Sequence, residues 1–207
     1  MRTRIKICGI TRMQDGRDAV EAGADALGFI FWRPSPRFIE PARAAPIVHA
    51  AGPFVSTVGV FVNPSREEVE ATIALSGVSM LQFHGEEPAS FCASFGRPWI
   101  KAFKVGQGGD LVESLGPYGA AAGWLFDAFD ERLVGGTGEQ FDWRLLPKDL
   151  DRPLILSGGM NVDNVGDAVR RLRPFAVDVS SGVEVGKGIK DAGRIRAFIQ
   201  GVTHAGQ

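Results

Sequence analysis

A cysteine and an aspartate stand at the ends of two strand-like runs of this chain. Cys8 closes the run that begins at Ile5, and Asp127 closes the run that begins at Gly123. A thiol and a carboxyl group can serve as the base and the acid of a proton-transfer reaction. Each also has a plainer interpretation, because a free cysteine is often a small core residue and a lone aspartate often caps a helix. We interpret the pair as the catalytic residues of an enzyme that moves protons on a small molecule.

Two glycine-containing turns indicate where a phosphate group would bind. Gly158 and Gly159 follow one strand-like run, and Ser180, Ser181 and Gly182 follow the next. Glycine lets backbone amides approach an anion closely, and α/β barrels often bind phosphate after strands seven and eight. We therefore expect a phosphorylated substrate. A nucleotide is not indicated, because the chain has neither GxxxxGK(S/T) nor a GxGxxG after its first strand.

Two further side chains are candidates for substrate binding. Arg37 lies in a proline-containing loop and could hold a carboxylate by two hydrogen bonds, as could Arg33, although a solvated arginine is the plainer interpretation of each. His84 follows the run Met80–Phe83 and could line the site or bond to the substrate. It has no partners at metal-ligand spacing, so no metal is expected. Cys92 lies in a predicted helix and is interpreted as a core residue.

Short apolar runs alternate with amphipathic stretches along the whole chain. Eight of these runs predict strands: Ile5–Cys8, Ala26–Phe31, Ser56–Val62, Met80–Phe83, Trp99–Phe103, Gly123–Asp127, Leu154–Ser157 and Ala176–Val179. Such alternation predicts an α/β protein with a parallel sheet. Eight units predict closure into a single (β/α)8 TIM barrel over residues 1–207, although the pattern alone also permits a doubly wound open sheet. The active site of such a barrel lies at the carboxyl ends of the strands.

Helix signals agree with this alternation. Apolar positions at helical spacing predict two helices with one buried face, formed by Val162, Val165, Ala168, Val169 and Leu172, and by Ala192, Ile195, Phe198, Ile199 and Val202. Thr11–Gln14 and Ser65–Glu68 match the capping-box pattern, and Gly23 and Gly77 stand where helices end. The stretch after the fifth strand is crowded with glycine and could be a ragged turn.

The alternation within the first strand predicts a buried ion pair. Residues two apart share a face, so Lys6 and Cys8 point the same way, into the barrel. Asp178 is flanked by valines in the eighth strand and should also point inward. Strands one and eight are neighbours in a closed barrel, so we expect Lys6 to pair with Asp178 near the floor of the site. The charge of Lys6 would also favour the thiolate of Cys8.

Composition limits the partners and the location of the protein. The chain has 207 residues, 44% hydrophobic and 23% charged, with a net charge of −1. Such a balance gives no bulk field that would favour nucleic acid or membranes, and no run of about 20 apolar residues occurs. Two cysteines without metal spacing fit a reducing compartment, so we expect a cytoplasmic protein. The sequence is compatible with a monomer or a homodimer.

The chain resembles the phosphoribosylanthranilate isomerase family of tryptophan biosynthesis. The matching stretches follow in order along nearly the whole chain: Lys6–Thr11, Glu21–Ala26 with Gly28 and Phe29, Ser35–Arg37, Val58–Phe61, Gln82–Glu86, Gly135–Gly138 with Phe141–Trp143, Leu156–Gly159 and Val177–Glu184. The first stretch (Lys6–Thr11) and the last (Val177–Glu184) occurring together are more specific for this family than any single glycine turn. The chain departs from the family at Phe38, where relatives often have tyrosine, and over Ala128–Val134.

The resemblance implies a cofactor-free isomerase with a phosphosugar substrate. It would convert N-(5-phosphoribosyl)anthranilate to 1-(2-carboxyphenylamino)-1-deoxyribulose 5-phosphate by an Amadori rearrangement. Cys8 would be the general base, Asp127 the general acid, and Arg37 the partner of the anthranilate carboxylate. We also expect His84 and Asp178 to contact the substrate.

Two other functions are alternatives to this isomerase, and one long connection could act as a lid. An aminoaldose isomerase of histidine biosynthesis would use two aspartates, which Cys8 argues against. A barrel that binds a phosphosugar without converting it would not need both Cys8 and Asp127. The long connection Ala128–Gln140 could act as a lid that buries Asp127.

Overall fold

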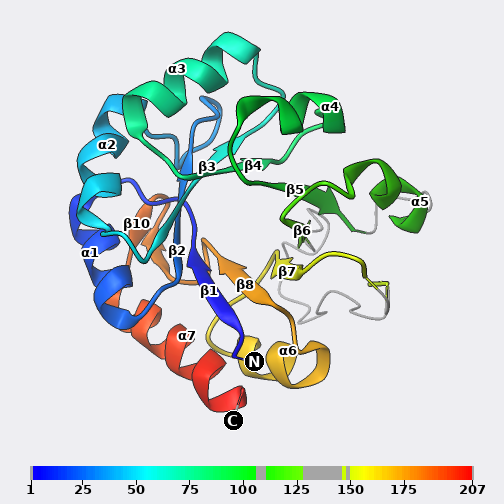
Figure 1. The fold of residues 1–207 in the computed structure, drawn as a ribbon. Helices are drawn as coiled ribbons and strands as arrows, with labels where there is room; N and C mark the ends of the chain where they lie inside the picture. Colours follow the sequence, from blue (N-terminus) through cyan, green and yellow to red (C-terminus); the bar gives the residue numbers. More distant parts are fainter. Residues whose placement is uncertain (1, 106–110, 128–145, 148–149, 207) are drawn as a thin grey trace.

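The computed structural model describes residues 2–105, 111–127, 146–147 and 150–206. Eight parallel strands form a closed barrel in sequence order, surrounded by helices (Figure 1). The strands are β1 (Arg4–Ile7), β2 (Ala26–Ile30), β3 (Ser56–Phe61), β4 (Met80–Phe83), β5 (Trp99–Lys104), β6 (Gly123–Asp127), β7 (Leu154–Ser157) and β8 (Ala176–Val179). The predicted TIM barrel is confirmed, and the open-sheet alternative is excluded because β1 pairs with β8.

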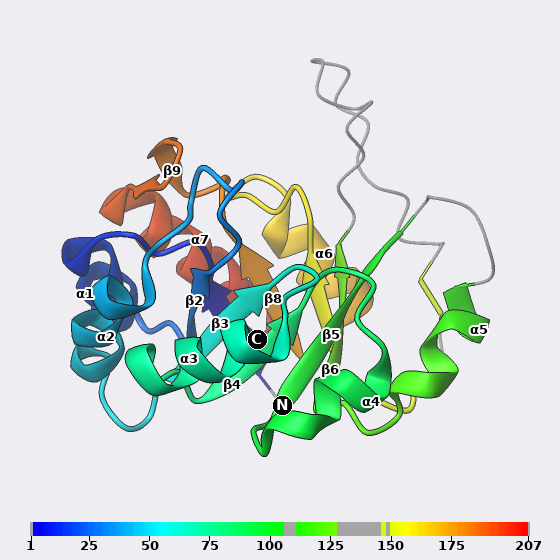
Figure 2. The same cartoon turned by 90° about the horizontal axis from the view of Figure 1, so that it is seen from above.

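The described helices lie outside the barrel. They are α1 (Met13–Ala22), α2 (Pro41–Ala50), α3 (Arg66–Ser76), α4 (Ala89–Cys92), α5 (Leu111–Leu115), α6 (Val165–Leu172) and α7 (Ala192–Ala205), with 3-10 turns η1 (Ala93–Phe95) and η2 (Gly116–Tyr118). A short antiparallel pair, β9 (Glu184–Gly186) and β10 (Ile189–Lys190), lies between β8 and α7. No pattern in the sequence predicted this hairpin. Figure 2 shows β9 on the same side of the barrel as the loop that follows β2.

Most helix signals are confirmed, and one is wrong. Ser65 accepts a hydrogen bond from the amide of Glu68, whose side chain bonds back to the amide of Ser65, so this capping box is present. The predicted box at Thr11 is not formed, because Arg12 is the N-cap and has no side-chain cap bond. The Thr11 hydroxyl instead donates to the carbonyl oxygen of Gly188 at 2.5 Å. Because the Thr11 side chain bonds to the β9–β10 hairpin, it does not cap helix α1.

Positive φ angles explain the two predicted helix ends. Gly23 and Gly77 have φ angles of 101° and 73°, in the left-handed region that favours glycine. The glycine-crowded stretch after β5 leads to α5 and η2, and its residues 106–110 lie outside the described part of the chain. Val162 precedes α6 and is exposed, so the stripe of that helix starts at Val165.

The buried apolar residues form two clusters, one on each side of the sheet. The larger cluster lies between the strands and the helices and includes Ile5, Ile7 and Cys92. The smaller cluster fills the barrel and consists of Val58, Ile100, Ala102, Leu125, Ile155 and Ala176. Alternation along each strand then places Lys6, Gln82, Asp127, Ser157 and Asp178 on the same inward face, closer to the carboxyl ends. The apolar interior thus supports a polar layer.

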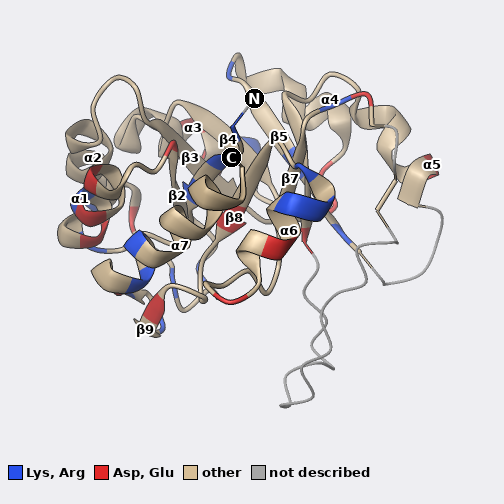
Figure 3. Cartoon of the chain, turned by 90° about the horizontal axis from the view of Figure 1, so that it is seen from below, with Lys and Arg blue, Asp and Glu red and all other residues tan. Residues whose placement is uncertain are grey.

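The charges of the described residues are mixed. Figure 3 shows Lys and Arg beside Asp and Glu on the same elements, as on α6, where Asp167 pairs with Arg170 and Arg171. Among the described helices, none is long and apolar enough to cross a membrane.

The Ser65 capping box predicts a measurable loss of stability. Replacing Ser65 by alanine should lower the free energy of unfolding by about 1 kcal/mol, because the amide of Glu68 loses its acceptor. Urea unfolding followed by circular dichroism measures this change. Ser65→Asp is the matched control and should stay close to the parent chain, since aspartate is an equally good cap. Equal stability of the alanine variant would contradict the prediction.

Candidate active site

Cys8, Lys6 and Asp178 meet where the barrel closes. Lys6 Nζ lies 2.9 Å from Asp178 Oδ1, and each side chain is only 6% exposed. The predicted ion pair is therefore confirmed, and the Ser157 hydroxyl donates to Asp178 Oδ2 at 3.3 Å. Cys8 follows β1 directly, and its amide donates to the carbonyl of Val179 at 2.8 Å. The thiol is thereby anchored at the carboxyl end of the seam between β1 and β8.

A glycine in β2 makes room for this group. A Cβ atom at Gly28 would lie 2.7 Å from Cys8 Sγ and 3.1 Å from Lys6 Cε. Any larger residue would therefore push the thiol and the ammonium group out of place. Gly28 belongs to one of the stretches that match the family, but its role in making room for the thiol was not predicted.

Burial dominates the acidity of Cys8. Loss of hydration raises the pKa of the Cys8 thiol, the charges of Lys6 and Lys190 lower it, and Asp178 raises it again. As expected, the charge of Lys6 lowers the pKa of Cys8. This effect does not outweigh burial, so the pKa of Cys8 is raised overall. Burial also opposes the charge of Lys6, yet Asp178 and Cys8 together raise the pKa of this lysine.

Asp127 and His84 face each other from β6 and the loop after β4. His84 Nε2 lies 3.0 Å from Asp127 Oδ2, and both side chains are partly exposed, at 21% and 23%. Gln82, which shares the inward face of β4, places its Nε2 atom 3.0 Å from His84 Nδ1. When the amide of Gln82 donates to Nδ1, the ring proton resides on Nε2 and is donated to Asp127. The polar Gln82 inside a short apolar strand is a signal that could have revealed this chain of contacts.

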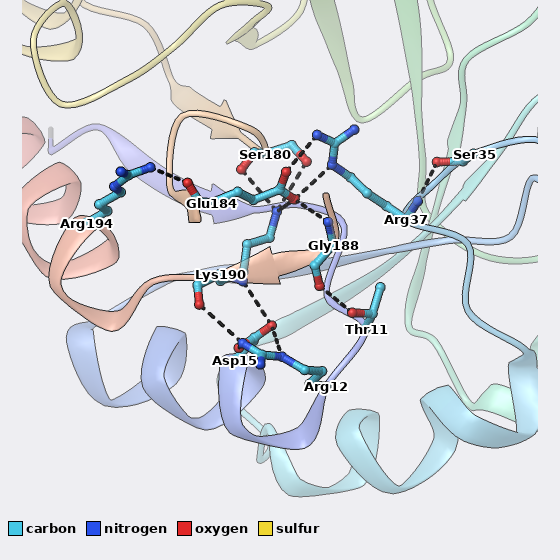
Figure 4. A network of polar contacts seen from close by, with 10 residues as sticks. All are labelled: Thr11, Arg12, Asp15, Ser35, Arg37, Ser180, Glu184, Gly188, Lys190 and Arg194. Atoms are coloured by element: carbon cyan, nitrogen blue, oxygen red, sulfur yellow. Dashed lines mark hydrogen bonds and ion pairs between the residues drawn. The ribbon is translucent and has the colours of Figure 1, made fainter. Parts of the chain in front are cut away.

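Arg37 is paired with a carboxylate of the protein. Its Nε and Nη2 atoms donate to Glu184 Oε1 and Oε2 at 2.8 and 2.7 Å. Figure 4 shows Glu184 also held by Lys190 and by the amide of Gly188. Arg37 was predicted as a site residue, but its contact with Glu184 was not, because no local pattern links residues that are 147 positions apart. The role of Lys190 was not predicted either.

The two expected phosphate turns pack against each other. Gly182 forms a parallel bridge with Asn161, and a Cβ atom at Gly182 would lie 2.0 Å from the carbonyl oxygen of Met160. Gly158 and Gly159 have φ angles of 80° and 63°. A Cβ atom at Gly159 would meet no atom within 4 Å, so this turn borders open space. Ser180 contacts the Lys190 ammonium through its carbonyl and hydroxyl oxygens.

Some predicted features lie outside the described residues. These are the proposed lid Ala128–Gln140, the turn Gly135–Gly138 and the stretch Phe141–Trp143. Within the described ranges, no group of three or more His, Cys, Asp and Glu side chains is placed to hold a metal ion. Arg33 of the Arg37 loop pairs with Glu40 in solvent rather than facing the site.

A family model and individual relatives match the chain over almost its whole length. The model described as "N-(5'phosphoribosyl)anthranilate (PRA) isomerase" matches residues 5–201. The N-(5'-phosphoribosyl)anthranilate isomerase of Dechloromonas aromatica is 53% identical over 205 residues, which cover 99% of this chain and 98% of the relative.

Solved structures give the same match. A phosphoribosyl anthranilate isomerase in complex with reduced 1-(o-carboxyphenylamino)-1-deoxyribulose 5-phosphate is 40% identical, with a TM-score of 0.84 over 98% of this chain and 99% of that one. A structure of monomers generated from the dimeric enzyme of Thermotoga maritima is 37% identical, with a TM-score of 0.82 over 97% and 98% of the two chains.

The position of Lys6 predicts how Cys8 titrates. Lys6→Met should raise the pKa of Cys8 further, because it removes the cation that favours the thiolate. Lys6→Arg, which keeps the charge, should leave the pKa closer to that of the parent chain. The ultraviolet absorbance of the thiolate during a pH titration measures the shift. Burial raises the pKa of Cys92 to about 12, so this second thiol does not interfere at lower pH. An identical titration of the Lys6→Met variant would contradict the assignment.

Proposed function

The chain belongs to the N-(5'-phosphoribosyl)anthranilate isomerase family, and we propose that Cys8 is the general base and Asp127 the general acid of its reaction. The enzyme converts N-(5-phosphoribosyl)anthranilate to 1-(2-carboxyphenylamino)-1-deoxyribulose 5-phosphate, an isomerisation in tryptophan biosynthesis. The observation that supports the two roles is position. Cys8 directly follows β1 and Asp127 ends β6, so the thiol and the carboxyl group belong to one rim of the barrel.

Ring opening is the task of Asp127. The ribose ring opens when its oxygen receives a proton, while the electron pair of the anthranilate nitrogen forms an iminium with C1. Asp127 must therefore enter the reaction as the protonated acid. When His84 Nε2 donates to Oδ2, the acid proton is carried on Oδ1, which has no other partner among the described residues. We infer that Gln82 and His84 orient this proton toward the substrate.

Proton removal is the task of Cys8. The iminium acidifies the hydrogen on C2, and the Cys8 thiolate takes this proton to give an enolamine that relaxes to the ketone. A base and an acid each contribute about 10² to 10⁴ in rate. Burial raises the pKa of Cys8 and favours the neutral thiol, so Lys6 and Lys190 are needed to limit this effect.

The remaining site residues bind the substrate in this proposal. Arg37 holds the anthranilate carboxylate, while His84 and Asp178 contact the sugar. The turns at Gly158–Gly159 and Ser180–Gly182 hold the phosphate through their amides. No cofactor takes part in the proposed steps, since proton transfers alone complete the isomerisation.

Three broader expectations belong to the same proposal. We infer that residues 1–207 form one barrel domain and that the enzyme works in the cytoplasm, with neither nucleic acid nor membrane as a partner. A monomer and a homodimer both remain compatible with the proposal. The phosphosugar substrate is the partner that the chemistry requires.

The two catalytic roles predict a severe loss of turnover. Cys8→Ala and Asp127→Asn should each lower kcat by about 10² to 10⁴ while the far-ultraviolet circular dichroism stays unchanged, because each variant loses one proton-transfer group. Loss of fluorescence of freshly prepared phosphoribosylanthranilate measures turnover. Cys92→Ala is the matched control, since it removes a thiol from the core and should keep most of the activity.

Two outcomes would contradict this proposal. Near-normal turnover by either variant would overturn its assigned role. Binding of the substrate by the parent chain without loss of fluorescence would favour the non-catalytic alternative.

A further inference from the structure

We propose that Glu184 and Lys190 are positioning residues that hold Arg37 so that only one edge of its guanidinium group faces the substrate. This inference rests on the proposed function, in which Arg37 binds the anthranilate carboxylate. It adds that the β9–β10 hairpin fixes the direction from which this carboxylate is bound.

The first step is the geometry of the ion pair. Glu184 binds Arg37 through the Nε and Nη2 atoms, which form the side edge of the guanidinium group. A guanidinium group has five N–H donors in a rigid plane. Two are used by Glu184, and Nη1 has no hydrogen bond with any residue of the described ranges. The outer edge, formed by Nη1 and the second proton of Nη2, therefore remains for a second carboxylate, as the direction of the side chain in Figure 4 illustrates.

Lys190 locks Glu184 in place and has no proton left for a ligand. Its ammonium donates to Glu184 Oε1 at 2.8 Å and to the carbonyl and hydroxyl oxygens of Ser180 at 3.0 and 3.2 Å. These three bonds use all its donors, and the side chain is fully buried. Lys190 thus ties the partner of Arg37 to the turn that follows β8.

The charges of this cluster do not cancel. Arg37 and Lys190 carry two positive charges against one negative charge on Glu184. Burial lowers the pKa of Lys190, while its bond to Glu184 and the charge of Cys8 oppose that effect. Burial opposes the charge of Glu184, but its bonds to Arg37 and Lys190 lower its pKa below the ordinary value. Glu184 therefore stays ionised, and the cluster keeps a net charge of about +1 with which to attract an anionic group.

Close packing of the backbone fixes the path of the Arg37 side chain. A Cβ atom at Gly9 would lie 2.7 Å from Arg37 Cδ and 3.0 Å from Ser180 Oγ. Gly9 has a φ angle of 75° and directly follows Cys8. The Arg37 stem thus crosses the chain beside the catalytic thiol, and Glu184 decides how its head group is turned. A carboxylate held on the outer edge is placed at a fixed orientation to Cys8.

The test uses Glu184→Gln. The glutamine oxygen can still accept from Lys190 and Gly188, but its NH₂ group would face Nη2 of Arg37, so two donors oppose each other and Arg37 must turn. The probes are reduced 1-(o-carboxyphenylamino)-1-deoxyribulose 5-phosphate and the same molecule without its carboxyl group. Calorimetry should show about tenfold weaker binding of the first probe and unchanged binding of the second. KM should rise more than kcat falls.

Matched variants make the test decisive. Glu40→Gln breaks the exposed pair with Arg33 in the same loop and should change neither probe. Arg37→Ala should abolish the preference for the carboxylate probe, and adding Glu184→Gln to it should have no further effect. Should Glu184→Gln fail to fold, Glu184→Asp carries the same test, because it keeps the charge but shortens the reach.

The outcomes separate the two proposals. If Arg37→Ala leaves the preference for the carboxylate unchanged, the role of Arg37 in the proposed function is wrong. If Arg37→Ala removes the preference but Glu184→Gln does not alter it, only the positioning role is wrong. Equal weakening of both probes by Glu184→Gln would also overturn it, because the effect would then be on the fold of the turn.

Discussion

The buried pair of Lys6 and Asp178 is the interaction on which the rest of the site depends. It joins β1 to β8, the two strands that must meet for the barrel to close. Removing one member of such a pair leaves an uncompensated charge at a cost of about 3–5 kcal/mol, whereas the intact pair adds little stability. We infer that the pair serves mainly to fix register, because a shift of one residue would turn Lys6 and Cys8 away from the interior.

A second buried ion pair fastens the loop after β4 to strand β5. Lys101 and Glu87 pair at 2.8 Å with side chains only 3% and 2% exposed. Glu87 also accepts hydrogen bonds from the amides of Asn63 and Gly85, and Lys101 donates to the carbonyl of Gly85. This network holds Gly85, the residue that follows His84. Lys190 and Glu184 do the same beside Arg37, so the loops that carry His84 and Arg37 are both fastened by a buried ion pair.

Local patterns predicted the elements, and tertiary contacts decided what the patterns could not. The alternation within β1 and β8 was enough to predict the pairing of Lys6 with Asp178, because strand geometry fixes the face of each residue. No such rule applies to the β9–β10 hairpin. The Thr11 hydroxyl donates to the carbonyl oxygen of Gly188 in this hairpin and therefore does not cap the helix as expected. Nor could the sequence show that Gly28 makes room for Cys8, since the distance depends on how two strands twist together.

The two proposed catalytic groups need opposite charge states, and they lie in different surroundings. Cations contributed by β1, β10 and the loop after β2 (Lys6, Lys190 and Arg37) all interact with Cys8. Asp127, across the barrel, lies 3.0 Å from His84, and its register partner in β5 is Lys104. Cations near a thiol favour its thiolate, but burial still leaves the pKa of Cys8 above its ordinary value. The charges of Lys6 and Lys190 are therefore as necessary to the proposed base as the thiol itself, because they offset part of the effect of burial.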